Sequence, residues 1–333
     1  MPALFRRLDP FMLQLLAAVA LAALLPARGA AAGVVENATG LGVALLFFLH
    51  GAKLAPRAVL GGLLQWRLQA LVLAATFLLF PLLGLGLTTL LGPWLPPALA
   101  MGLLYICVLP STVQSSIAFT SVAGGNVPAA LCAATLSNLG GMLLTPLLVA
   151  WLMHGAGAGG FSGQVVADIG LHLLLPFALG QAARPLIGGA LGRHKAVVSL
   201  ADRGSILLAV YAAFGEGVVA GIWERMSLGS LALVVALDVA LLGMVLLATW
   251  AAGRAIGLGR AEAVVAVFCG SKKSLASGIP MANILFPAAL VGPVVLPLML
   301  FHQIQLFACA ALARRYARPA AAELPAQPRA AAA

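Results

Sequence analysis

Two adjacent lysines, Lys272 and Lys273, lie in the stretch FCGSKKSLASG (268–278), which long apolar segments flank on both sides. The chain is 62% hydrophobic and 8% charged, so two neighbouring cations in such a place need an explanation. A lysine at the centre of a bilayer costs about 2.5–3.5 kcal/mol, and a pair facing lipid would cost on the order of 5–7 kcal/mol. We therefore expect both ammonium groups to face a cavity, a polar partner or a bound anion.

Acidic partners for these lysines are scarce in the sequence. Of the nine carboxylates, only Asp238 falls near the middle of a predicted span, whereas Glu216 and Glu262 fall nearer to span ends. The centre of the molecule is therefore expected to carry net positive charge, which favours a carboxylate or sulfonate ligand. Because burial disfavours the charged form of an amine, either lysine is also a possible proton carrier.

A second polar stretch, LPSTVQSSIAF (109–119), interrupts another apolar segment in the same way. Pro110 and Gly270 mark the two interruptions, and each is followed by serine and further polar residues. A broken helix frees backbone groups that must be buried in protein or line water, and its half-helix ends attract ions. A proline kink in an ordinary helix is the simpler alternative. The residues predicted to bind substrate or a coupling ion are Ser111, Thr112, Gln114, Ser115, Ser116, Thr135, Ser137, Asn138, Ser271, Lys272, Lys273, Ser274, His302 and Gln303.

The elements that position these residues are predicted to be transmembrane helices. Apolar runs of about 18 residues or more recur along the chain, and its mean hydropathy is +1.08. The runs do not alternate as barrel strands do, and backbone in lipid must satisfy its own hydrogen bonds, so the predicted class is an all-α polytopic membrane protein. The ten predicted spans are 10–27, 38–54, 68–90, 97–123, 127–152, 165–187, 204–221, 228–252, 261–286 and 288–312.

The basic residues predict how these spans are oriented. Their distribution predicts that both termini lie in the cytoplasm. The net charge of +10 is then explained by topology, and no nucleic-acid partner is expected. The alternative of a cleaved signal peptide in residues 1–32 would leave nine spans. On the cytoplasmic side we place Arg6, Arg7, Lys53, Arg57, Arg67, Arg184, Arg193, Lys195, Arg203, Arg254, Arg260, Arg314, Arg315, Arg318 and Arg329, and on the other side only Arg28 and Arg225.

The two interrupted segments occupy matching places in the two halves of the chain. Five spans precede the gap and five follow it, and an odd number of spans per half gives the halves opposite orientations. Interrupted segments at matching positions of an inverted repeat indicate a transporter's binding site. The predicted units are a first repeat at 1–153, a connecting loop at 154–164, a second repeat at 165–316 and a disordered cytoplasmic tail at 317–333.

At these residues the chain resembles the bile acid:sodium symporter superfamily, and more narrowly its bacterial branch related to vertebrate solute-carrier family 10 member seven. The matching motifs are LFFLHGAKL (46–54), LPSTVQSSIAFTSVAGGNVPAALCAATLSNLGGMLLTPLL (109–148), FCGSKKSLASGIPMANILFP (268–287) and FHQIQL (301–306). The resemblance implies that spans four and nine cross at unwound centres. It also implies a core domain of spans 3–5 and 8–10, a panel domain of the other four spans, and alternating access between the two domains.

The resemblance breaks down at the residues that the family uses for sodium. Sodium-coupled members hold the ion with polar groups of spans four and five and with a Glu and a Gln around the span-nine break. With Gly270 as anchor, that Glu falls at Phe268, the Gln at Lys272 and the following Asn at Lys273. We therefore predict that Lys272 replaces the coupling ion and that transport is sodium-independent or proton-coupled.

These observations predict a secondary active transporter of an organic, anionic solute. No cofactor or metal site is expected beyond a possible coupling ion, Na⁺ or H⁺, and the four cysteines are expected to be small buried residues. No nucleophile–base motif is present, so an enzyme is not expected. The alternatives are a non-transporting membrane regulator of ion (calcium) homeostasis or envelope assembly, and a passive channel. A monomer and a homodimer both remain open.

Overall fold

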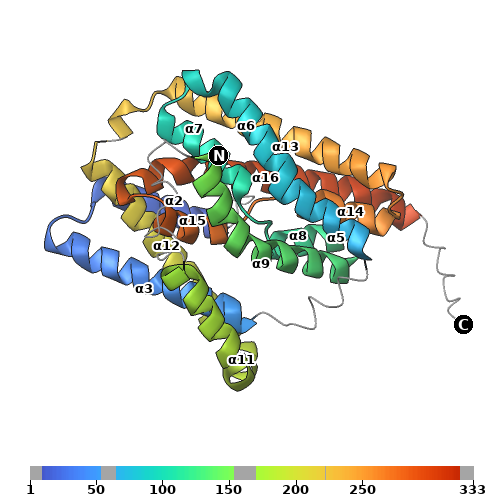
Figure 1. Cartoon of the computed structure of the whole chain (residues 1–333), viewed down its shortest axis with the longest axis horizontal. Coiled ribbons are helices and arrows are strands. Elements are labelled where there is room, and N and C mark those ends of the chain that lie inside the picture. Colours follow the sequence, from blue (N-terminus) through green and yellow to red (C-terminus); the bar gives the residue numbers. More distant parts are fainter. Residues whose placement is uncertain (1–9, 54–64, 154–169, 222, 323–333) are drawn as a thin grey trace, which may run out of the picture.

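The computed structural model describes residues 10–53, 65–153, 170–221 and 223–322, and within these ranges every regular element is a helix (Figure 1). α5 runs through a π-helical turn, η2, directly into α6. The longer helices are α2 (Pro10–Leu24), α3 (Ala30–Lys53), α5 (Trp66–Ala74), η2 (Ala75–Leu79), α6 (Phe80–Leu91), α7 (Pro97–Val108), α8 (Gln114–Val122), α9 (Val127–Leu152), α11 (Leu175–Arg193), α12 (Lys195–Val219), α13 (Leu228–Ala255), α14 (Arg260–Gly270), α15 (Leu275–Leu285) and α16 (Ala288–Ala322). Shorter turns are η3 (Gly92–Trp94), η4 (Gly170–Leu174) and η5 (Trp223–Arg225).

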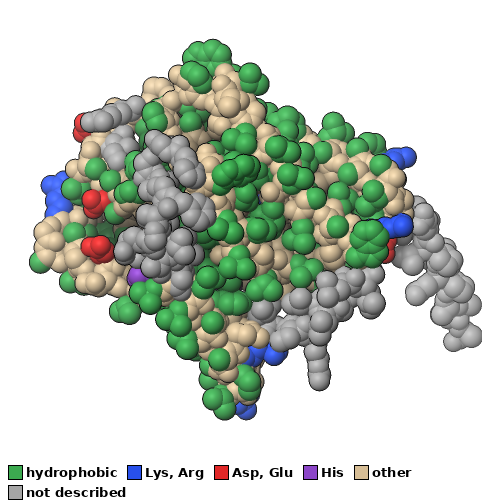
Figure 2. All heavy atoms as spheres, in the orientation of Figure 1, with side chains coloured by type: hydrophobic (Ala, Val, Ile, Leu, Met, Phe, Trp, Pro, Cys, Tyr) green, Lys and Arg blue, Asp and Glu red, His purple; other side chains and the backbone are tan. Residues whose placement is uncertain are grey.

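The surface of this helical assembly is that of an integral membrane protein. Six helices of the described chain are long and apolar enough to cross a membrane, and α7 and part of α2 are shorter apolar helices. Large apolar side chains such as Leu24, Leu186 and Leu228 are exposed. Figure 2 shows hydrophobic side chains across the middle of the molecule and charged side chains towards its ends. The predicted class of all-α polytopic membrane protein is confirmed at this level.

Several helices extend beyond their predicted spans. α3 begins at Ala30 rather than at residue 38, and α12 begins at Lys195 rather than at residue 204. The prediction assigned the charged residues there to loops, whereas these helices include them. α16 continues to Ala322, past the predicted start of the tail. The rest of the tail, 323–333, and the connecting loop at 154–164 lie outside the described residues.

The helices form two groups. α3 packs against α11 and α12, and α12 packs against α2; these four helices are called here the four-helix group. α12 also packs against α15 and α16 and so joins this group to the rest of the molecule. The remaining long helices form the larger group, in which α5, α6, α13, α14 and α16 run together in Figure 1. α3 and α11 approach so closely that a Cβ on Gly51 would clash with the Phe177 carbonyl oxygen, and a Cβ on Gly180 with that of Phe48. This is the small-residue packing of membrane helices.

Both predicted helix breaks are confirmed, because helix pairs stand where continuous spans would otherwise run. α7 ends at Val108 and α8 begins at Gln114, and Leu109 between them is extended, as a residue before proline should be. α14 ends at Gly270 and α15 begins at Leu275, with Ser274 as its N-cap. The four cysteines are free and buried, as expected.

Candidate functional site

The two helix breaks lie against each other and share hydrogen bonds. The Ser274 amide at the start of α15 donates to the Pro110 carbonyl over 2.8 Å. In return, the Ser111 hydroxyl donates to the Cys269 carbonyl near the end of α14 over 2.6 Å. Backbone groups freed at each break therefore find partners at the other, which is the condition for irregular backbone inside a membrane protein.

Helix α9 joins this junction through two side chains. The Ser111 amide donates to the Ser137 hydroxyl over 2.9 Å, and the Asn138 side-chain nitrogen donates to the Ser111 carbonyl over 2.8 Å. The Asn138 side-chain oxygen accepts from the Ser277 hydroxyl at the start of α15 over 3.1 Å. Ser111, Ser137, Asn138 and Ser274, all predicted site residues, therefore meet at one place. We call this set of contacts the crossing.

The ammonium group of Lys273 lies in a cage of backbone carbonyls. It donates to the carbonyls of Thr76, Cys107 and Leu109 over 2.8, 2.9 and 2.7 Å. Its nitrogen also lies 4.0 Å from the centre of the Phe80 ring, a favourable distance for a cation–π contact. An ammonium has three protons to donate and a neutral amine has two, so the geometry matches the charged form. The Lys273 side chain is fully buried.

Two features of local structure make these carbonyls available. Cys107 and Leu109 lie at the end of α7, where the last carbonyls of a helix have no partners within it and carry partial negative charge. The Val108 carbonyl there accepts from the Thr145 hydroxyl over 2.7 Å. The Thr76 carbonyl lies in the π-helical turn η2, where the Phe80 amide bonds to Ala75 instead of to Thr76. The register change of one residue thus frees the third carbonyl for Lys273.

The backbone of Lys273 is fixed by α16. Its amide donates to the Gln305 side-chain oxygen and its carbonyl accepts from the Gln305 side-chain nitrogen, each over 2.9 Å. That nitrogen also lies 2.9 Å from Nδ1 of His302. The break is therefore also held by α16, which packs against α7 as well.

Lys272 has the opposite surroundings. Its side chain is fully buried, and its nitrogen makes no hydrogen bond to any residue the structure describes. The nitrogen lies 4.1 Å from the centre of the Phe119 ring, within a cluster that includes Phe268 and Cys309. The sequence prediction gave Lys272 the place of a coupling ion, whereas the carbonyl cage belongs to Lys273. The buried carboxylate of Asp238 pairs with neither lysine.

The other predicted residues divide between the crossing and its surroundings. Ser115 and Ser116 both bond to the Thr112 hydroxyl, and Ser116 also lies 3.2 Å from the Phe268 carbonyl. Ser271 bonds within its own helix, to Val267. Gln114 is exposed, Thr135 is half-buried, and the side-chain oxygen of Gln303 has no partner among the described residues.

Sequence reasoning missed Thr76, Phe80 and the carbonyls of α7 as contributors to the site. Most backbone carbonyls have no signature in side-chain types, but Pro81 was a usable signal, because proline has no N–H to bond a carbonyl of the preceding turn, where Thr76 lies. The described residues contain no group of three or more His, Cys, Asp or Glu side chains that could hold a metal ion.

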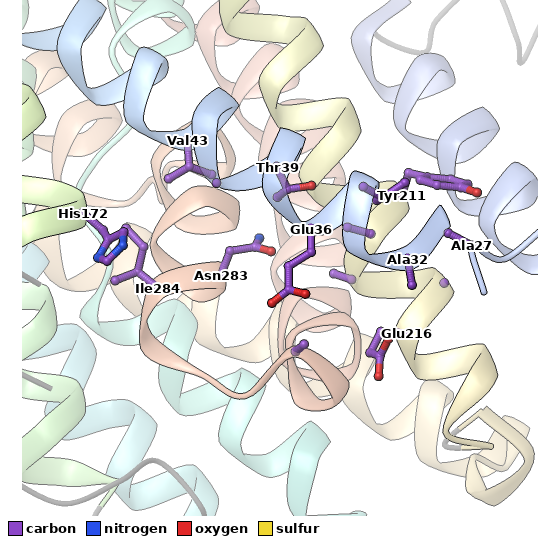
Figure 3. Close-up of a pocket in the computed structure, with 16 residues that line it drawn as sticks. Ala27, Ala32, Glu36, Thr39, Val43, His172, Tyr211, Glu216, Asn283 and Ile284 are labelled. Carbon is purple, nitrogen blue, oxygen red and sulfur yellow. The ribbon is translucent and has the colours of Figure 1, made fainter. Parts of the chain in front are cut away.

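A separate pocket of about 660 Å³ lies where the four-helix group meets the larger group (Figure 3). α3 and α12 form one side, and the end of α15 and the start of α16 form the other. Glu36, Thr39, Tyr211, Glu216 and Asn283 are among its polar lining residues. Neither lysine of the crossing lines it.

Broken helices that meet at their breaks are typical of secondary transporters. Residues 9–318 match the model of the SBF-like CPA transporter family, and the chain belongs to that family. It is 52% identical over 319 residues to "Putative symporter YfeH" of Escherichia coli (strain K12), with 95% of each chain covered. It is 24% identical over 310 residues to sodium/bile acid cotransporter 7 of Danio rerio, covering 90% of this chain and 91% of that one. The predicted kinship with the bile acid:sodium symporter superfamily is confirmed.

Proposed function

We propose that this protein is a secondary active transporter of an organic solute that works without bound sodium, because the Lys273 ammonium fills the cation site at the crossing. The observation that carries the proposal is the Lys273 nitrogen with its three carbonyl acceptors. Carbonyl oxygens at the ends of broken helices are the groups that coordinate sodium in other transporters. A tethered ammonium supplies the same charge, so a sodium ion would have neither room nor free ligands there.

The arrangement of helices supports alternating access as the mechanism. The crossing ties α7, α8, α9, α14 and α15 together, so these helices are expected to move as one core. The four-helix group has its own close contact between α3 and α11 and is the natural panel. The pocket lies between the two, where relative movement would open and close it. We extend the proposal to ten spans in two inverted repeats, with both termini in the cytoplasm, on the basis of charge placement.

A binding screen followed by counterflow tests this function. Purified protein is heated with a panel of organic solutes, anions included, in sodium buffer and in potassium buffer. A solute at about 100 times its dissociation constant should stabilise the fold by about 2.7 kcal/mol, and we expect the same shift in both buffers. Solutes that bind are then loaded into proteoliposomes, and labelled solute should accumulate by exchange.

Two results would contradict the proposal in different ways. A thermal shift that requires sodium would mean that the Lys273 ammonium does not replace the ion. Binding without exchange in the proteoliposomes would contradict transport and favour a non-transporting membrane regulator. The sequence predicts an organic anion as the solute. The panel contains organic anions, so the screen tests that expectation directly.

A further inference from the structure

The pocket between the two helix groups has the size and place of a solute site. Its volume of about 660 Å³ lies within the range of about 300–1,000 Å³ that is usual for small-molecule sites. Its walls come from both groups, with Glu36 on α3, Glu216 on α12 and Asn283 on α15. A solute bound there would contact each of the parts that alternating access moves.

The described lining of this pocket carries two carboxylates, Glu36 and Glu216, and one histidine, His172. No lysine or arginine is among the lining residues that the structure describes. In the described part of the chain, the salt bridge that forms is between Lys53 and Asp202, away from the pocket. Figure 3 shows the Glu36 side chain reaching from α3 into the pocket, with Glu216 across from it on α12. Glu36 is exposed and Glu216 is half-buried, so a solute that enters the pocket can reach both carboxylates.

Tyr211 and Asn283 are neutral side chains of the pocket. Each donates a hydrogen bond to a backbone carbonyl and keeps its oxygen as a possible acceptor. The Tyr211 hydroxyl donates to the Leu25 carbonyl over 2.7 Å. The Asn283 side-chain nitrogen donates to the Ile279 carbonyl in its own helix over 2.9 Å, which leaves the amide oxygen without a hydrogen bond among the described residues. In Figure 3 the Asn283 amide points towards Glu36. These groups suit a ligand that donates hydrogen bonds.

Thr39 is a buried threonine in the wall of the pocket, and its hydroxyl lacks the usual partner among the described residues. Only 6% of this residue is exposed. Threonines in membrane helices usually bond to the carbonyl four residues earlier. Thr76 and Thr249 do so over 2.8 and 2.7 Å. The Thr39 oxygen itself has almost no accessible surface, so a solute in the pocket would reach it only if the pocket wall moved.

We infer that this pocket binds a positively charged organic group of the solute, an ammonium or guanidinium, between Glu36 and Glu216. The inference rests on the proposed transport function and names the charge of the solute. Lys272 and Lys273 do not oppose it, because both are fully buried and outside the pocket. The group is recognised by two carboxylates and by the acceptor oxygen of Asn283, and the remaining volume takes the rest of the solute.

Charge-selective labelling of an introduced cysteine tests the inference without requiring transport. Ala32→Cys places a thiol in the pocket lining, and Thr89→Cys places one on an exposed part of α6 as the control. The four native cysteines are buried. The rates of reaction with trimethylammonium-ethyl and sulfonatoethyl methanethiosulfonate are compared at each position. Two unpaired carboxylates should raise the cation-to-anion ratio at position 32 about tenfold or more above that at position 89.

The carboxylates must be the cause of this preference. Combining Ala32→Cys with Glu36→Gln and Glu216→Gln should return the ratio to that of the control position. Equal ratios at positions 32 and 89, or a faster anionic reagent at position 32, would overturn the inference even if the protein transports an organic anion. A preserved ratio in the glutamine variant would also overturn it.

A competition experiment then shows whether a cationic group binds in the pocket or is only attracted to it. Choline and its uncharged isostere 3,3-dimethylbutan-1-ol are compared for their ability to slow labelling at position 32 by the neutral methyl methanethiosulfonate. We expect saturable protection by choline, weakened at least about tenfold by Glu36→Gln together with Glu216→Gln. Protection by taurocholate without choline, equal protection by choline and its isostere, or no protection by choline would refute binding of a cationic group.

Discussion

Lys272 and Lys273 are neighbours in the chain, yet their ammonium groups lie in opposite environments. The Lys273 nitrogen has three carbonyl acceptors, whereas the Lys272 nitrogen has the face of Phe119 and no hydrogen-bond partner among the described residues. A buried charge is tolerated when it is fully hydrogen-bonded and is costly when it is not. The two lysines therefore make different contributions to stability and to function.

Replacing each lysine by methionine should separate these contributions. Lys273→Met leaves the Thr76, Cys107 and Leu109 carbonyls without their donor, and we expect it to cost about 3–5 kcal/mol of unfolding free energy. Lys272→Met exchanges one cation–π contact, worth about 2 kcal/mol, for relief from burying an unpaired charge, so the net change should stay within about 1 kcal/mol. Thermal unfolding in detergent measures both, each serving as the control for the other. A larger loss for Lys272→Met would contradict this assignment.

The sequence was informative about where the site lies and less so about which atoms form it. Pro110 and Gly270 predicted both breaks because polar residues follow each of them in an apolar segment, whereas Pro146, Pro185 and Pro280 lie inside continuous helices. Which of Lys272 and Lys273 reaches the α7 carbonyls depends on the course of the backbone between the end of α14 and the start of α15, which no local sequence pattern encodes. The Thr76 carbonyl is free because of a one-residue change of register in an apolar segment. Glu216 was interpreted as a residue near a span end, and only the packing of α3 on α12 shows it facing a pocket with Glu36.

At the scale of elements, the four-helix group depends on the contact of α3 with α11. The contact has no space for a Cβ at Gly51 or Gly180, where backbone carbonyls of the other helix lie. Backbone cannot move aside as the end of a side chain can, so even a methyl group should separate the helices. The panel proposed above needs this contact in order to act as one body.

Gly180→Ala tests the contact, with Gly189→Ala as the matched control in the same helix. Position 189 has nothing within 4 Å of an added Cβ, so the substitution there should be neutral or add up to about 1 kcal/mol through helix propensity. Gly180→Ala should destabilise the protein by about 1–3 kcal/mol through overpacking. Thermal unfolding of the two variants gives the comparison. Equal melting temperatures would show that α3 and α11 are not held in backbone contact.

At the scale of the whole molecule, the structure separates the fixed charge from the solute. The Lys273 ammonium lies at the crossing, inside the larger group, and the pocket with Glu36 and Glu216 lies between the two groups. The crossing then needs no ion to hold its two breaks together during transport. Only the pocket exchanges its ligand during transport, and the solute supplies the positive charge that balances the two carboxylates.

The response of stability to sodium tests the central claim, that the Lys273 ammonium replaces a bound cation, most directly. Melting temperatures of the wild-type protein and of Lys273→Ala are measured over a range of NaCl, with KCl and methylammonium chloride as parallel series and Lys272→Ala as the control. We predict no saturable sodium effect on the wild-type protein or on Lys272→Ala. For Lys273→Ala, whose carbonyl cage is vacated, we predict saturable stabilisation by sodium or methylammonium, reaching about 2.7 kcal/mol at 100 times the dissociation constant. Saturable stabilisation of the wild-type protein by sodium, lost on Ser111→Ala, would contradict the account.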